Sequence, residues 1–122
     1  MKWFIKLVCA LCAFGSMNVY AATAQVTTQV DRIVIDDVLY AGCLAYIPTA
    51  VSNSLAGCLD YYVSLDCTGE LGTSRTVSTA KLNAAYVGLV TGKRVILVID
   101  DSRKANGYCL AKYFEVTEYD PL

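Results

Sequence analysis

The distribution of cysteine constrains this chain more than any other feature. The sequence holds six cysteines. Two lie in an apolar N-terminal stretch, Cys9 and Cys12, and four lie farther along, Cys43, Cys58, Cys67 and Cys109. An even set of four is typical of a small domain that is stapled by disulfides in an oxidising compartment. The sequence therefore predicts two disulfides and an exported protein.

Residues 1–21 have the three parts of a secretory signal peptide. Lys2 and Lys6 make a positive start, an apolar run follows over 7–14, and Val19-Tyr20-Ala21 fits a small-x-small cleavage site. The run is too short for a membrane anchor, which needs roughly 20 apolar residues. We therefore predict that cleavage after Ala21 leaves residues 22–122 as a single disulfide-stapled β domain, secreted or periplasmic and without membrane insertion.

The charge of the predicted mature chain argues against nucleic acid as a partner. Loss of the two leader lysines leaves eight basic residues against 11 acidic ones, a formal charge of −3. Nucleic-acid-binding domains present clustered Lys and Arg instead.

Apolar periodicity predicts three strands before a helix. Residues 25–35 alternate, but the alternation changes phase near Asp31-Arg32, which indicates a bulge or strong bend. A turn at Asp36-Asp37 leads to a strand over 38–47, which Pro48 ends. After a loop over 49–57, a cleanly alternating strand is predicted over 59–66.

A helix and two more strands complete the predicted order. Apolar residues at helical spacing predict a helix over 79–91, with Ser78 as N-cap, Gly92 after its C-terminus and Gly88 where another backbone comes close. An apolar strand over 94–100, a polar connection over 101–107 that ends in a tight Asn106-Gly107 turn, and a strand over 108–118 follow.

This order, β-β-β-α-β-β, predicts a five-stranded OB-like barrel that is mainly β with one helix. A bent first strand and a helix between the third and fourth strands are features of that barrel. The alternative is an open α+β sheet with one covering helix.

Strand geometry narrows the three possible disulfide connectivities to two. If residues 58–66 are extended, Cys58 and Cys67 lie roughly 30 Å apart, whereas a disulfide needs Cα atoms within about 7 Å. We favour Cys43 with Cys58 and Cys67 with Cys109, because Cys43 and Cys58 flank the Pro48 loop between consecutive strands. Cys43 with Cys67 and Cys58 with Cys109 stays open.

The residue types do not favour catalysis, a metal or a cofactor. The chain has no histidine, which removes the commonest general base and every His-ligated metal site. Ser78 and Lys81 match an S-x-x-K string without its companion motifs, and Ser78 is expected to cap the helix. The carboxylate pairs Asp36-Asp37 and Asp100-Asp101 are interpreted as solvated turns, because their spacing fits no calcium loop.

Tyrosine is the residue type most suited to binding. The phenol ring offers an apolar face and a hydroxyl, which suits sugars and protein contacts. Tyr61 and Tyr86 fall on apolar faces and are predicted to be core residues. Tyr40, Tyr62 and Tyr113 are the predicted binding surface.

Several segments together resemble the B subunits of pertussis-like and subtilase-type AB5 toxins. These segments are the leader, the loop between Cys43 and Cys58, the helix that ends in Leu89-Val90-Thr91-Gly92-Lys93, and the strand directly after it. The resemblance implies an OB-fold, a ring of five subunits and non-catalytic binding of sialylated glycans.

The toxins' binding residues do not transfer to this chain. The toxins bind sugar through a serine near the first strand and a tyrosine late in the strand after the helix. This chain has Thr27, Thr28 and Gln29 in the first region and Val98-Ile99 in the second. The resulting expectation is an exported, non-catalytic binding module for a glycan, or an accessory or inhibitor protein that acts through a protein surface.

Overall fold

Two short strands replace the single bent strand predicted near the start of the domain. The structure, a computed structural model, describes residues 22–118, so the predicted signal peptide lies outside the described residues. β1 (Thr23–Thr28) pairs antiparallel with β5 (Arg94–Ala105), whereas β2 (Arg32–Ile35) pairs antiparallel with β3 (Cys43–Tyr46). The change of phase in the sequence therefore marks the point where the chain leaves one strand partner for another.

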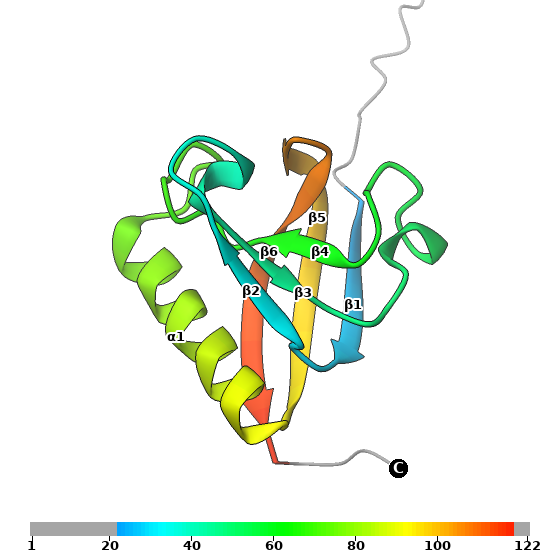
Figure 1. The fold of residues 1–122 in the computed structure, drawn as a ribbon. Coiled ribbons are helices and arrows are strands. Elements are labelled where there is room, and N and C mark those ends of the chain that lie inside the picture. Colours follow the sequence, from blue (N-terminus) through cyan, green and yellow to red (C-terminus); the bar gives the residue numbers. More distant parts are fainter. Residues whose placement is uncertain (1–21, 119–122) are drawn as a thin grey trace, which may run out of the picture.

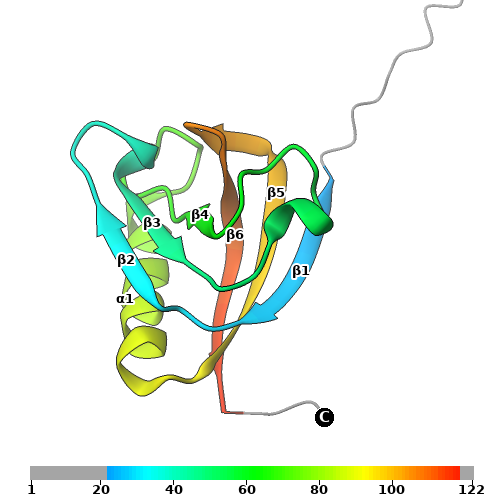
Figure 2. The ribbon, with the colours of Figure 1, turned by 45° about the vertical axis from the view of Figure 1, so that its right-hand side comes forward.

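The strands form one six-stranded mixed sheet in the order β1-β5-β6-β4-β3-β2. β4 (Tyr62–Ser64) runs parallel to β6 (Tyr108–Thr117), and every other pair is antiparallel. The fold is mainly β with one helix, and it fits the open α+β sheet given above as the alternative. The edge strands β1 and β2 are consecutive in the chain, and the strongly curved sheet allows residues 29–31 to connect them (Figures 1 and 2).

The hydrophobic core lies on the concave side of the sheet, under the helix and the loop after β3. Burial of apolar side chains is the main source of stability in a domain of this size. The members of this core with no measurable exposure are Cys43, Ala45, Ile47, Val63, Leu65, Ala85, Val95, Leu97, Ile99, Cys109 and Ala111.

α1 (Arg75–Thr91) begins four residues before the predicted start. Ser74, not Ser78, is its N-cap, with the Ser74 hydroxyl accepting from the Val77 N–H at 3.3 Å. The predicted C-terminus is confirmed, since Gly92 adopts a left-handed φ of 66° and donates to the Gly88 carbonyl. A Cβ on Gly88 would lie 3.0 Å from Val95 Cγ1, so a β5 side chain, not a second backbone, needs the space here.

The strand predicted over 59–66 shrinks to the three residues of β4. Tyr61 has a φ of 69° and Asp66 a φ of 56°, and this left-handed backbone stops the extended geometry on both sides. Val63 and Leu65 point into the core as predicted, but Leu59 and Tyr61 are 50% and 45% exposed. The predicted inward alternation therefore holds within and after β4 but fails for the residues before it.

β5 and β6 form a long hairpin that closes at the predicted turn. Asn106 and Gly107 both have positive φ, 53° and 84°, as a tight two-residue hairpin turn requires. β5 runs on through residues 101–105, which were predicted as a connection. Ile99 of β5 pairs with Ala111 of β6, and Val98 of β5 pairs with Tyr113 of β6. Lys112 is therefore an extra residue in β6, and it changes which β6 side chains point inward.

The disulfides join Cys43 to Cys67 and Cys58 to Cys109, with Cα separations of 5.7 and 5.5 Å. The favoured pairing was therefore wrong, whereas the exclusion of Cys58 with Cys67 is confirmed. Pairing of β3 with β4 sets Cys43 beside Leu65, whose N–H donates to the Cys43 carbonyl. Cys67 follows Leu65 by two residues and therefore lies close to Cys43. The loop after β3 carries Cys58 to the hairpin, where Leu59 N–H donates to Gly107.

Candidate functional site

Strand register gathers aromatic side chains on the outer face of the sheet. In β3 and β4, Cys43, Ala45 and Val63 point into the core, so the alternate residues Tyr46 and Tyr62 point outward. Tyr46 pairs directly with Tyr62 across these strands. Cross-strand neighbours of this kind have side chains in contact.

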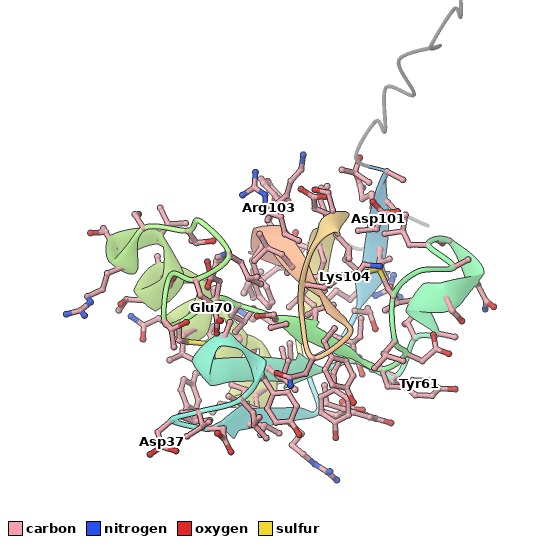
Figure 3. All side chains as sticks on the ribbon, turned by 90° about the horizontal axis from the view of Figure 1, so that it is seen from above. Asp37, Tyr61, Glu70, Asp101, Arg103 and Lys104 are labelled. Carbon is pink, nitrogen blue, oxygen red and sulfur yellow. A yellow bond between two sulfur atoms is a disulfide. The ribbon has the colours of Figure 1, made fainter. Side chains whose placement is uncertain are left out.

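Five tyrosines continue this contact into one series, here called the tyrosine row. Its order is Tyr40, Tyr108, Tyr62, Tyr46, Tyr61, with ring centroids 5.7, 5.5, 5.1 and 6.2 Å apart. The first three contacts are edge-to-face, which suits the quadrupoles of the rings. The row crosses β6, β4 and β3, and Figure 3 shows Tyr61 pointing outward at the rim of the molecule.

Arg32 adds a positive charge to the row. It pairs with Tyr46 across β2 and β3, its guanidinium carbon lies 5.6 Å from the Tyr46 ring centre, and Nη1 donates to the Tyr62 hydroxyl at 3.4 Å. A guanidinium at this distance from an aromatic ring is in cation–π contact. Within residues 22–118, no carboxylate forms an ion pair with this exposed arginine.

The two ends of the row stand on unusual backbone. Tyr40 and Tyr61 have φ values of 62° and 69°, where a bulky residue costs on the order of 1–3 kcal/mol. The surrounding contacts must compensate for this strain. Ile47 N–H donates to the Tyr61 carbonyl at 2.8 Å, and Tyr40 N–H donates to the Asn106 side chain at 2.8 Å.

The structure divides the predicted binding tyrosines. Tyr40 and Tyr62 both belong to the row, where each contacts Tyr108. Tyr113 lies outside it, 49% exposed, and its hydroxyl donates to Glu115. That hydrogen bond, together with the Glu115 charge, raises the pKa of Tyr113.

The prediction that Tyr61 and Tyr86 are core residues is wrong. Tyr61 is turned outward by its left-handed backbone and is 45% exposed. Tyr86 is 42% exposed, because Ala85 and Gly88 form the buried stripe of α1 beside it.

Sequence reasoning also missed Tyr46, Tyr108 and Arg32. The signal that could have found Tyr46 is the antiparallel pairing of the strands on either side of Pro48, which sets it opposite Tyr62.

A separate hollow of about 320 Å³ lies at the end of β1 and is lined by Thr27, Thr28, Gln29, Pro48 and Arg94. The Thr28 and Thr49 hydroxyls share a hydrogen bond of 2.8 Å beside it. No tyrosine of the row lines the hollow. The row is therefore distinct from this concave region.

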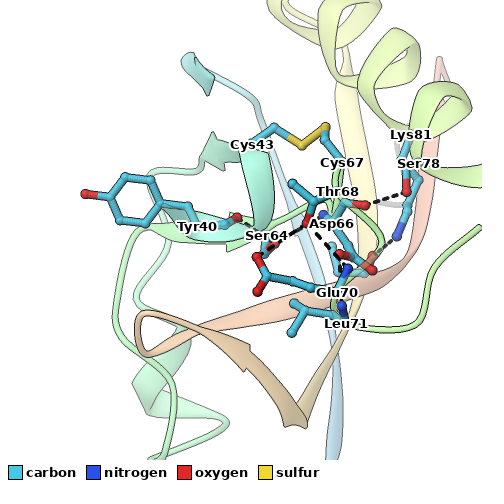
Figure 4. The surroundings of a disulfide bond; sticks show 11 residues. Tyr40, Cys43, Ser64, Asp66, Cys67, Thr68, Glu70, Leu71, Ser78 and Lys81 are labelled. Atoms are coloured by element: carbon cyan, nitrogen blue, oxygen red, sulfur yellow. Dashed lines mark hydrogen bonds between the residues drawn. A yellow bond between two sulfur atoms is a disulfide. The ribbon is translucent and has the colours of Figure 1, made fainter. Parts of the chain in front are cut away.

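The S-x-x-K residues bind the main chain. The Ser78 hydroxyl donates to the Asp66 carbonyl at 2.6 Å, and Lys81 Nζ donates to the Ala111 carbonyl at 2.9 Å (Figure 4). Burial lowers the pKa of Lys81, although the Asp66 charge opposes this. These bonds fix α1 to the loop after β4 and to β6.

The two carboxylate pairs differ in their surroundings. Asp36 accepts from the Val38 and Leu39 N–H groups, which lowers its pKa, and it lies in a turn as predicted. Asp100 is only 3% exposed inside β5, which corrects its interpretation as a solvated turn residue. Burial opposes its ionisation, but hydrogen bonds from Ser102 and the nearby Arg103 charge still lower its pKa. Residues 22–118 bring no three metal-ligating side chains together.

No family model, curated protein or solved structure matches this chain. Among the helices of residues 22–118, none is both long and apolar enough to cross a membrane.

Proposed function

We propose that this protein is an exported, non-catalytic module that binds carbohydrate on the tyrosine row. The observation that carries this proposal is the contact of five phenol rings in one series on the outer face of the sheet. Phenol rings present apolar faces and edges to the C–H groups of a sugar, while their hydroxyls exchange hydrogen bonds with its hydroxyls. Rings held by strands and by each other lose little entropy when a ligand binds.

Arg32 selects the kind of carbohydrate. A guanidinium without a carboxylate partner is free to form a bidentate pair with an anionic group of the ligand. It lies beside Tyr46 and Tyr62, so the same ligand reaches both. The favoured ligand is a saccharide with an acidic unit.

The proposed fold behind this surface is an OB-like barrel. One observation supports closure: the edge strands β1 and β2 are consecutive in the chain and are joined by residues 29–31. Two disulfides suit the oxidising compartment that export implies, whether periplasmic or extracellular. A pentameric ring is supported by the toxin resemblance alone, and the mass of the secreted protein in solution tests it.

A glycan array with the secreted protein tests the proposed function. We expect binding to acidic saccharides that Tyr61→Ala and Tyr62→Ala both weaken and that Tyr113→Ala leaves unchanged. Tyr113 is the matched control, because it is as exposed as Tyr61 but outside the row. Equal loss in all three variants, or no saccharide bound by the unaltered protein, would refute carbohydrate binding on this surface.

A second candidate, an accessory or inhibitor protein, is favoured by the outer face of α1. Arg75 and the buried Lys81 are the only charged residues of this helix. Val87 and Val90 are 49% and 82% exposed on it. Affinity capture from the secreted or periplasmic fraction distinguishes the two functions. A protein captured by the unaltered chain and lost with Val87→Glu, with a blank glycan array, would favour this second function.

A further inference from the structure

Tyr40 occupies the end of the row farthest from Arg32 and begins a left-handed turn. Tyr40, Ala41 and Gly42 have φ values of 62°, 55° and 91° in succession. Only glycine adopts such backbone without strain, so Tyr40 and Ala41 need bonds from outside the turn to stay there. The position of the Tyr40 ring therefore depends on what holds this turn.

Three bonds from separate parts of the chain hold Tyr40 and Ala41 in this turn. Ser64 Oγ, on β4, donates to the Tyr40 carbonyl at 3.2 Å, and Thr68 N–H, beside Cys67, donates to the Ala41 carbonyl at 2.9 Å. Figure 4 shows Tyr40 projecting away from the Cys43–Cys67 disulfide, with its carbonyl beside Ser64. The third bond runs from the Tyr40 N–H to Asn106 Oδ1 at 2.8 Å.

The Asn106 bond differs from the others because it joins two parts of the row. Asn106 occupies the tight turn of the β5–β6 hairpin, two residues before Tyr108. Tyr108 is the ring that Tyr40 contacts, at a centroid distance of 5.7 Å. One side-chain amide thus ties the backbone of Tyr40 to the hairpin that carries its aromatic neighbour.

We propose that Asn106 is a positioning residue that holds Tyr40 against Tyr108 and so extends the row to accept an oligosaccharide instead of a single sugar. The inference rests on the proposed function. Arg32 and Tyr46 contact the acidic unit, and Tyr108 and Tyr40 contact units farther along the ligand. Longer ligands gain affinity from the far end only while Tyr40 stays in place.

Two substitutions separate the bond from the turn. Asn106→Gly keeps a residue that adopts positive φ freely but removes the acceptor. Asn106→Asp keeps an oxygen acceptor at the same position and also tolerates left-handed backbone. Both variants should retain the hairpin. Formation of the Cys58–Cys109 disulfide and an unchanged thermal unfolding temperature would confirm this.

The test compares binding of an acidic monosaccharide and an acidic tetrasaccharide that contains it by calorimetry. For Asn106→Gly we expect about tenfold weaker binding of the tetrasaccharide, the factor that corresponds to the loss of roughly one hydrogen bond, and unchanged binding of the monosaccharide. Asn106→Asp should restore the tetrasaccharide affinity at high salt, where repulsion between the new carboxylate and the acidic ligand is screened. Tyr40→Ala should show the same selective loss as Asn106→Gly.

Two outcomes would overturn the positioning role of Asn106, and a third would overturn carbohydrate binding itself. Equal loss for both ligands in Asn106→Gly, or unchanged tetrasaccharide binding, would overturn the positioning role while carbohydrate binding stands. If the unaltered protein binds neither ligand, the proposed function itself fails, and this inference fails with it.

Discussion

Two groups of tyrosines lie on the surface of this protein, and high exposure alone does not identify the row. Tyr61 in the row is 45% exposed and its other four rings are half-buried, whereas Tyr86 and Tyr113 outside it are 42% and 49% exposed. The difference is in their neighbours. Each ring of the row contacts one or two others across strands, whereas no aromatic contact within residues 22–118 involves Tyr86 or Tyr113. Isolated exposed apolar residues are ordinary, but a contiguous aromatic surface indicates binding.

The largest expected effect comes from removal of the Cys58–Cys109 disulfide, which lies beside Tyr108. Its loop of 51 residues predicts a loss of about 4 kcal/mol in unfolding free energy, against about 3 for the 24-residue separation of Cys43 and Cys67. Urea unfolding of the paired serine variants measures both values. Equal or reversed losses would mean that loop entropy does not control the contributions of these bridges.

Tyr62→Ala should destabilise the domain by about 1–3 kcal/mol, because it removes two edge-to-face ring contacts in the middle of the row. Tyr113→Ala should cost less than about 0.5 kcal/mol, as exposed substitutions usually do. Chemical unfolding of both variants measures the difference. Similar losses of unfolding free energy in the two variants would show that the ring contacts of Tyr62 add no stability.

Arg32→Gln should weaken binding of an acidic saccharide by about tenfold, since it removes one charge-assisted hydrogen-bonding group. Lys112→Gln is the control, because Lys112 is another exposed cation but lies at the bulge of β6. Titration calorimetry at low and at high salt measures both. If both variants lose affinity equally, attraction by net charge explains the binding, and Arg32 has no specific role.

The smallest effect is spectroscopic and concerns a tyrosine outside the row. The hydrogen bond to Glu115 raises the pKa of Tyr113, so its phenolate should form at higher pH than an ordinary tyrosine. A raised pKa favours the folded protein while Tyr113 is protonated, and this contribution disappears as the pH rises through the folded pKa. Absorbance titration should show that Glu115→Gln shifts one ionisation to lower pH. An unchanged curve would contradict this local account.

The extent to which the sequence predicted this molecule follows from which interactions are local. The C-terminus of α1 and the Asn106-Gly107 turn were predictable, because glycine and asparagine at those positions specify left-handed backbone. Pairing of the cysteines was not, because it depends on where the loop after β3 crosses to the hairpin. The phase of Tyr61 was also hidden, because its positive φ is imposed by tertiary contacts.

Only part of the candidate site could be predicted from the sequence, for the same reason. Tyr62 could be assigned to the outer face by alternation alone, and the structure confirms that orientation. Tyr108 joins Tyr62 only because β6 runs parallel to β4, a pairing between strands that are distant in sequence. The row exists in the register of the sheet, and no short motif encodes it.

Whether the tyrosine row binds an acidic oligosaccharide is tested by an NMR titration of the protein, labelled with carbon-13 in its tyrosine rings. We expect shifts for the rings of the row, Tyr40, Tyr46, Tyr61, Tyr62 and Tyr108, while Tyr86 and Tyr113 stay unchanged. Shifts confined to Tyr86 or Tyr113, or no shift in any ring, would refute carbohydrate binding on the row.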